Sequence, residues 1–228
     1  MRIAIGVPTL SRHDLLLRLC ESITEQSFVP AKVLIVDNSN GTMDLSMSTA
    51  MLKVAGIDYE VHHFHNLGVA GSWNYIMDTT KDYDLTVITN DDNKLISEAL
   101  EEFKKVAEKH PSQNYFTTKT GGFSVFALRP QAMEETGKFD DAYYPAYYED
   151  NDYHYRMKLK GLDFVTTDVE VYEMGVDGQA SQTLNGAQTS LEDKRMVEFG
   201  SVSNHMRYRR KWGGDPHEET YIVPFNQK

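Results

Sequence analysis

Residues 85–93 read Leu85-Thr86-Val87-Ile88-Thr89-Asn90-Asp91-Asp92-Asn93, a run with strand preference that ends in two adjacent acids flanked by amides. A buried strand of this kind brings its polar end to the edge of an open α/β sheet, where ligands bind. Adjacent carboxylates repel each other, so a site that keeps both ionised usually holds a cation, and their hard oxygens suit Mg²⁺ or Mn²⁺. The alternative is an exposed turn, because Asn and Asp dominate turns. The stretch alone leaves both interpretations open.

Strand and helix patterns alternate before this stretch. We predict strands at 2–7, 32–36 and 57–64, a helix from 14 to about 28–30, a weak helix at 42–54, and a glycine-bearing turn at 66–74 that opens a short helix. The strand at 32–36 is apolar except for its first residue, as in a sheet that is covered on both faces. The alternation predicts an α/β fold with a mostly parallel sheet, helices on both faces and right-handed crossovers.

The second half of the chain changes character around a tyrosine-rich loop at 139–148, which contains Tyr147 and Tyr148. Sugars stack their apolar faces on aromatic rings, so this loop is typical of a binding surface, and a lid over the core is the alternative. The elements predicted around it are helices at 96–109, 130–136 and 149–160, and strands at 115–118, 123–128 and 169–173.

The composition limits the class of protein. With 34 acidic and 23 basic residues the formal net charge is −11, which argues mildly against a broad nucleic-acid-binding surface, although the run at 207–212 is basic. The single cysteine, Cys20, leaves no disulfide framework or thiolate metal site within the chain and fits a reducing compartment. The sequence shows no signal peptide and no run of the ~20 apolar residues that a membrane span needs. We therefore expect a soluble, cytoplasmic protein.

Several separated motifs occur in a definite order along the first 168 residues. They are Gly6-Val7-Pro8-Thr9 with Arg12, Val36-Asp37, Asn66-Leu67-Gly68 through Asn74, Asn90-Asp91-Asp92-Asn93, Gly121-Gly122-Phe123, and Tyr148-Glu149-Asp150-Asn151-Asp152 with Arg156. Each motif is weak alone, but in this order they resemble the inverting family-2 glycosyltransferases with the GT-A fold. The segments at 211–214 and 224–226 are similar to a tail found in small glycosyltransferases of bacteria, phages and large viruses.

The resemblance implies a domain organisation. A GT-A domain would cover 1–175, with a nucleotide-binding half at 1–95 and an acceptor-binding half at 96–175. A C-terminal helical extension at 176–228 would pack on the same domain.

The resemblance also implies roles for particular residues. A nucleoside-diphosphate sugar such as a UDP-sugar would be bound by Pro8, Thr9, Arg12, Asp37, Asn66, Asn74 and Asp91. Asp92 would hold Mn²⁺ or Mg²⁺ against the two phosphates, and Asp150 would act as the general base that activates an acceptor hydroxyl. Contacts to donor and acceptor would come from Gly121, Gly122, Tyr147, Tyr148, Glu149 and Trp212.

Two departures from the family pattern leave alternatives open. Asn90 stands where the family usually has the first acid of an Asp-x-Asp motif, so Asp92 is the expected metal ligand. Glu173 stands where many relatives have a histidine, and it is either a further metal ligand or a solvated side chain. Glu149 and Asp152 are close enough in sequence to be alternatives to Asp150 as the base.

Other functions are compatible with an α/β sheet. A sugar nucleotidyltransferase is disfavoured because the loop at 8–12 has no glycine, and a dinucleotide-dependent oxidoreductase because no Gly-x-Gly-x-x-Gly follows a strand. A nucleotide- or carbohydrate-binding module without turnover remains open. The expected acceptor is a glycan or lipid-linked glycan rather than a hydroxymethylated DNA base. If the acceptor were DNA, the basic run at 207–211 would contact its phosphates.

Overall fold

The structure is a computed structural model that describes residues 1–173 and 191–227, without the side chains of 173 and 191–193. Its fold is centred on a seven-stranded sheet. Six strands share one direction and β7 runs against them, which confirms the predicted mostly parallel sheet. In spatial order the strands are β3 (Tyr59–His63), β2 (Lys32–Asp37), β1 (Ile3–Thr9), β4 (Leu85–Thr89), β7 (Val125–Leu128), β6 (Tyr115–Thr117) and β8 (Val165–Thr166).

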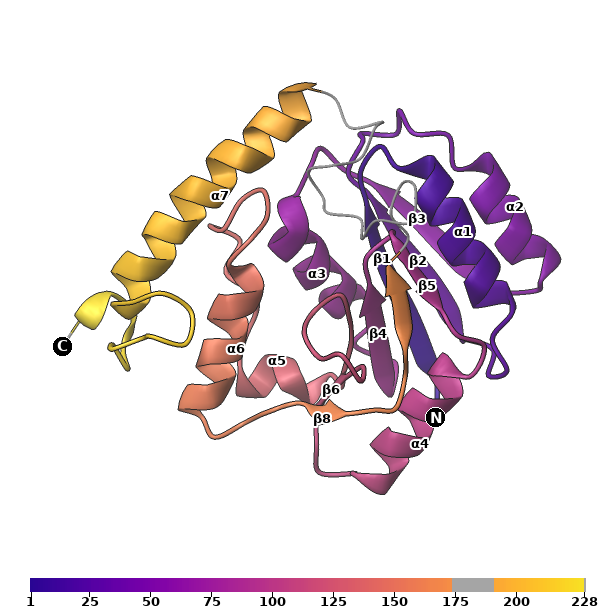
Figure 1. Ribbon diagram of the computed structural model, residues 1–228. Helices are drawn as coiled ribbons and strands as arrows, with labels where there is room; N and C mark the ends of the chain where they lie inside the picture. The colour runs from indigo at the N-terminus through magenta and orange to yellow at the C-terminus, as the bar shows by residue number, and fades with distance from the viewer. Residues whose placement is uncertain (174–190, 228) are drawn as a thin grey trace.

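Helices cover both faces of the sheet, as Figure 1 shows for α1 and α2 on one side and α3 on the other. The alternation of side chains along β2 explains this: Val33 and Ile35 pack into one core, while Leu34 and Val36 pack into the other. The first core includes residues of α1 (His13–Thr24), α2 (Ser46–Val54) and α4 (Ala99–Lys109), and the second includes residues of α3 (Gly68–Thr79), α5 (Gln131–Glu135) and α6 (Glu149–Leu159).

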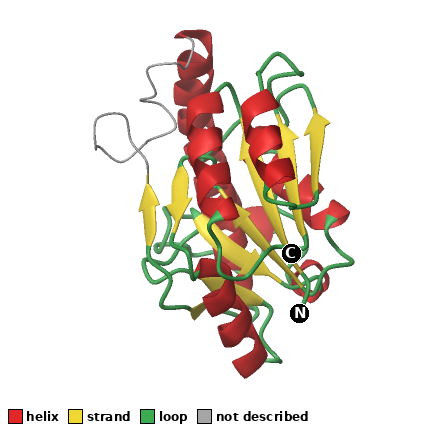
Figure 2. Cartoon of the chain, turned by 90° about the vertical axis from the view of Figure 1, so that its right-hand side faces the viewer, coloured by secondary structure: helices red, strands yellow, loops and turns green. Residues whose placement is uncertain are grey.

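Two local features differ from the sequence prediction. The first helix ends at Thr24 rather than near 28–30, because Ser27 N–H donates to Ser97 O at 2.8 Å and the Gln26 side chain donates to Ile96 O at 2.7 Å. These bonds tie the chain to the segment before α4. The short strands β5 (Asn93–Leu95) and β9 (Val171–Glu173) pair antiparallel in a second sheet beside the main one (Figure 2, left).

The C-terminal helix α7 (Leu191–Trp212) lies beside α6 (Figure 1), and the turn η2 (Pro224–Asn226) follows it. Fully buried Asp152 on α6 joins the two helices, since it accepts from Trp212 Nε1 at 2.8 Å and pairs with Lys211 Nζ at 2.5 Å. Arg156 Nε pairs with the same carboxylate at 2.9 Å. Removing one partner of this buried network would leave an unpaired buried charge, which is strongly destabilising. No helix in the described ranges combines the length and apolar character that a membrane crossing requires.

Candidate functional site

A cavity of about 580 Å³ opens at the carboxyl ends of β1 and β4, against the tyrosine-rich loop. This is the edge of the sheet at which the sequence placed the site. The cavity brings together many residues predicted from sequence, namely Pro8, Thr9, Arg12, Asn66, Asp91, Asp92, Tyr147, Glu149 and Asp150. Residues far apart in the chain therefore converge on one volume that is large enough for a small-molecule ligand.

Asp91 and Asp92 follow β4 after Asn90 and line the cavity; the alternative of a turn at 90–93 is correct for 91–92, but the turn is partly buried and not exposed. Thr9 Oγ1 donates to Asp91 Oδ2 at 2.6 Å, which links the ends of β1 and β4. Burial raises the pKa of Asp91 to about 7, the bond from Thr9 opposes this rise, and the negative charge of Asp92 adds to it. A buried carboxyl group whose ionisation is unfavourable, next to a second carboxylate, forms a place where a cation would be stabilised.

The carboxyl groups present fit a divalent cation that is shared with a phosphate ligand. Within 1–173 and 191–227, no cluster of three or more His, Cys, Asp or Glu residues could hold a metal ion by itself. Mg²⁺ is usually held by one or two carboxylates together with substrate phosphates and water, which is what Asp92 and Asp91 can offer. Glu173 ends β9 opposite Asn93, and its side chain lies outside the described residues.

Two acids at the start of α6 face the same cavity. Burial raises the pKa of Asp150 above its ordinary value against the opposing hydrogen bond from Asn151 N–H, which donates to Asp150 Oδ1 at 2.8 Å. Glu149 is only 5% exposed, and burial together with the charge of Asp150 raises its pKa well above the ordinary range. A carboxylate with a raised pKa is a stronger base, so this end of the cavity suits proton transfer. Asp152 is instead enclosed by Arg156 and the α7 side chains, outside the lining of the cavity.

Asp37 does not line the cavity. It is fully buried, and its carboxylate accepts from Ser39 N–H at 2.8 Å, Gly41 N–H at 3.1 Å and His63 Nδ1 at 2.7 Å. Burial alone would raise the pKa of Asp37, but the bonds from Ser39 and His63 outweigh it and lower the pKa. Asp37 therefore shapes the loop after β2, next to the cavity rather than in it.

The other predicted site residues also lie outside the cavity lining. Asn74 exchanges two hydrogen bonds with the backbone of Phe139, at 2.9 and 2.8 Å. The Tyr148 ring stacks on His205 with centroids 5.3 Å apart. Gly121 and Gly122 adopt φ of +76° and +82° in the turn before β7, and Trp212 belongs to the buried contact with Asp152.

Several lining residues were not predicted. Asn38 accepts from Leu67 N–H at 2.8 Å and donates to Ser72 Oγ at 3.0 Å, so it fixes the start of α3 against the end of β2. Its position directly after a buried strand was a usable signal. Trp73, Phe123 and Val197 also line the cavity, although none of them was predicted from the sequence to be a site residue.

The cavity wall formed by residues 145–147 is held from two sides. Pro145 O accepts from Val69 N–H at 2.8 Å, and a Cβ at Gly68 would lie 2.8 Å from the same oxygen. Buried Asn204 on α7 donates through Nδ2 to Ala146 O at 2.9 Å and Tyr147 O at 3.2 Å. Tyr147 has φ of +76°, an unfavourable conformation for a bulky residue that the surrounding contacts must maintain.

We expect Asn204→Ala to lower the free energy of unfolding by about 1–3 kcal/mol, because it removes the donor to two loop carbonyls. Urea unfolding measures the change. Ser203→Ala, at an exposed neighbouring position on the same helix, is the control and should stay within about 0.5 kcal/mol of wild type. Equal stability of the two variants would show that α7 does not hold the loop.

The basic run at the end of α7 is engaged in ion pairs. Arg207 Nη2 and Lys211 Nζ pair with Asp140 Oδ2 at 3.2 and 2.8 Å, and Arg209 Nε lies 3.6 Å from Asp215 Oδ1. These pairs use the positive charges within the chain, so they favour a structural role for much of this run over phosphate binding.

No family model matches the chain, and no curated protein matches it in sequence. Among solved structures, residues 1–349 of S. aureus TarS in complex with UDP-GlcNAc match with a TM-score of 0.59 and 15% identity, over 89% of this chain and 66% of that one. The same TarS segment with UDP matches with a TM-score of 0.57 and 12% identity, over 68% and 55%. Mannosyltransferase PcManGT from Pyrobaculum calidifontis, in complex with GDP-Man and Mn²⁺, matches with a TM-score of 0.53 and 15% identity, over 72% and 54%.

The chain thus spans between about half and two thirds of the length of these matched structures. At such low sequence identity, the structural similarity is evidence for the fold alone. The strand order, the two helical layers and these matches together show that the chain has the GT-A glycosyltransferase fold.

Proposed function

We propose that this chain is a metal-dependent inverting glycosyltransferase that moves a sugar from a nucleoside-diphosphate sugar to a hydroxyl group of a glycan or lipid-linked glycan. One observation carries the proposal: the acid pair after β4 and Asp150 at the start of α6 line a single cavity of a GT-A fold. The nucleotide sugars and Mn²⁺ bound by the similar solved structures support it.

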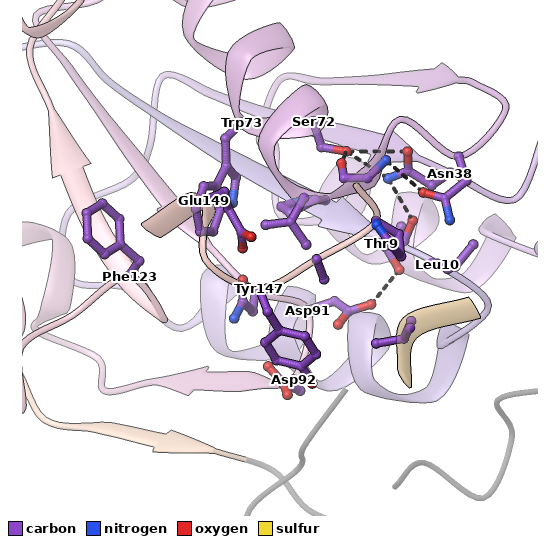
Figure 3. Close-up of a pocket in the computed structure, with 18 of the residues that line it drawn as sticks. Thr9, Leu10, Asn38, Ser72, Trp73, Asp91, Asp92, Phe123, Tyr147 and Glu149 are labelled. Carbon is purple, nitrogen blue, oxygen red and sulfur yellow. Dashed lines mark hydrogen bonds between the residues drawn. The ribbon is translucent and has the colours of Figure 1, made fainter. Parts of the chain in front are cut away.

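The layout of the cavity supports one orientation of the donor. In Figure 3, Thr9, Leu10 and Asn38 lie at one end, Asp91, Asp92 and Tyr147 lie between, and Trp73, Phe123 and Glu149 lie at the other end. The nucleoside would occupy the first end, within the half at 1–95. The diphosphate would lie along the acid pair, and the sugar would point toward α6 in the half at 96–175.

Asp150 would perform the proton transfer. Its carboxylate takes the proton of the acceptor hydroxyl as that oxygen attacks the anomeric carbon, and the bond from the carbon to the diphosphate breaks on the opposite face. A single displacement of this kind inverts the configuration at the carbon. Asp92, with Asp91 beside it, would hold the divalent cation, which when bound offsets the negative charge that collects on the departing diphosphate. Tyr147 and Val69 also line the cavity.

The ion pairs on α7 favour a glycan acceptor over DNA. Arg207, Arg209 and Lys211 are paired with acids of the same chain, and the net charge is −11. A surface that binds a phosphate backbone needs positive charges that are available to the ligand.

A thermal-shift assay with UDP and GDP, each with and without MnCl₂, tests the proposal. At least one of the two nucleotides should raise the melting temperature of the wild type in a Mn²⁺-dependent way, because a ligand of the native state stabilises it. Asp92→Asn should weaken that binding by about tenfold or more, since it removes a charged ligand of the cation. Asp141→Asn makes the same charge change at an exposed position and should bind like wild type. Nucleotide binding that is indifferent to both Mn²⁺ and Asp92→Asn would contradict metal-dependent transfer.

A further inference from the structure

Two polar side chains at the α6 end of the cavity have buried atoms without a partner among the described residues. They are Trp73 Nε1 and Glu149 Oε2, on side chains that are 3% and 5% exposed. Both residues line the cavity, and Figure 3 shows them at its far end from Thr9. Buried polar groups are nearly always hydrogen-bonded in native proteins, so an unpaired donor and an unpaired carboxyl oxygen on two residues that line one cavity point to a ligand that satisfies them.

The surroundings of this pair are apolar and aromatic. The Trp73 ring stacks on Phe123 with centroids 6.0 Å apart and meets Phe139 edge-on at 4.9 Å, and Phe123 and Val69 also line the cavity. A sugar ring presents C–H groups on its faces and hydroxyl groups at its edge. An aromatic wall with one N–H donor and one carboxyl group matches both parts of such a ring.

The charge of the cavity restricts which sugar fits. Its acids are Asp91, Asp92, Glu149 and Asp150, and among the described lining residues Arg12 is the only base. Arg12 precedes α1, close in the chain to Thr9 and Leu10, which lie at the opposite end from Glu149. A carboxylate on the sugar would therefore meet the like charge of Asp150 without a nearby cation from the chain to offset it.

Building on the proposed donor site, we propose that Trp73 and Glu149 are specificity-determining residues that select an uncharged sugar. The Trp73 N–H donates to one oxygen of the sugar, and the Glu149 carboxyl group bonds one of its hydroxyls. A uronic acid is excluded by the neighbouring acids. The burial that raises the pKa of Glu149 supports this pairing, because a neutral carboxyl group can both donate to and accept from a hydroxyl.

Isothermal titration calorimetry in the presence of Mn²⁺ tests the proposal, with UDP, UDP-glucose, UDP-N-acetylglucosamine and UDP-glucuronate, and with GDP and GDP-mannose. The variants are Trp73→Phe and Glu149→Leu, which remove the polar atoms at similar size, and Glu149→Gln, which keeps an oxygen acceptor. Tyr115→Phe is the control, since Tyr115 belongs to the same buried cluster as Trp73 but does not line the cavity.

We expect Trp73→Phe and Glu149→Leu each to bind the uncharged nucleotide sugar about three- to tenfold more weakly, with the affinity for the bare nucleoside diphosphate unchanged. Glu149→Gln should recover most of that loss, Tyr115→Phe should bind like wild type, and the wild type should bind UDP-glucuronate at least about tenfold more weakly than UDP-glucose. Trp73 Nε1 and Glu149 Oε2 form no hydrogen bond among the described residues. The Glu149 carboxyl group does accept from its own backbone N–H, and Glu149→Gln keeps an oxygen for that bond.

The failures are distinguishable. If nucleoside diphosphates bind but the variants match wild type for nucleotide sugars, or UDP-glucuronate binds as well as UDP-glucose, the assignment of Trp73 and Glu149 is overturned and the glycosyltransferase proposal stands. If none of the nucleotides binds, the glycosyltransferase proposal falls and this assignment falls with it.

Discussion

Asp150→Asn should slow sugar transfer by about 10²–10⁴-fold while leaving the affinity for the nucleoside diphosphate unchanged, because a general base contributes a factor of that size. The amide keeps the oxygen that accepts from Asn151 N–H, so the start of α6 should be preserved. The measurement is the turnover rate with a panel of hydroxyl acceptors, together with the nucleotide dissociation constant. Asp168→Asn, an exposed acid outside the cavity, should keep the wild-type rate.

The pH profile provides a second readout of the same residue. A general base must be deprotonated, so the rate falls as the pH falls through its pKa. Because burial raises the pKa of Asp150, this fall should begin at a higher pH than the ordinary value of 3.8 would give. An Asp150→Asn enzyme that retains more than about a tenth of the wild-type rate would contradict the assignment. Glu149 would then be the remaining carboxyl group at that end of the cavity.

Asp91→Asn should make the free energy of unfolding of the metal-free protein less dependent on pH. The pKa of Asp91 is about 7 in the folded chain, against an ordinary value of 3.8, so between these two pH values the folded state binds more protons than the unfolded state. The free energy of unfolding therefore falls as the pH rises through this window and levels off above it. Between pH 5 and pH 8, this group should lower the stability of wild type by on the order of 2–3 kcal/mol.

Urea unfolding at pH 5 and pH 8 in EDTA measures this difference. Asparagine retains an oxygen that can accept from Thr9 Oγ1, so the variant should keep the fold and lose only the pH-dependent term. Its free energy of unfolding at pH 8 should exceed that of wild type, because the variant lacks the buried charge, although it also loses a carboxylate that could bind the cation. Identical pH dependence in the two proteins would contradict the raised pKa of Asp91.

The fold was predictable where the signal is local. The apolar runs of β2 and of β4, which precedes Asp91 and Asp92, show their burial directly in the sequence. The early end of α1 and the pairing of β5 with β9 were not predictable, because both depend on hydrogen bonds to segments about 70 residues or more away. Such contacts form only once the topology is set, and local propensity cannot report them.

In the site, too, residues with a local sequence signal could be predicted, and residues placed by distant contacts could not. Asp92 could be placed because it follows a central strand at the ligand-binding edge of the sheet, whereas Asp150 was expected at the site only through the family resemblance. Asp37 also ends a strand, but the bonds from Ser39 and Gly41 turn its carboxylate into the following loop. The role of Asn204 could not be predicted from the sequence. It depends on α7 packing against the loop, whose bonded residues lie 57 and 58 positions earlier in the chain.

A crystal structure of the protein with MnCl₂ and the nucleotide sugar that it binds best, with the manganese located by anomalous scattering, tests the central claim most directly. The account predicts manganese within about 2.0–2.5 Å of an Asp92 carboxylate oxygen and against the diphosphate. The nucleoside should lie at Thr9 and Asn38 and the sugar at Trp73 and Glu149. Manganese bound away from Asp92, or a nucleotide sugar bound outside this cavity, would contradict it.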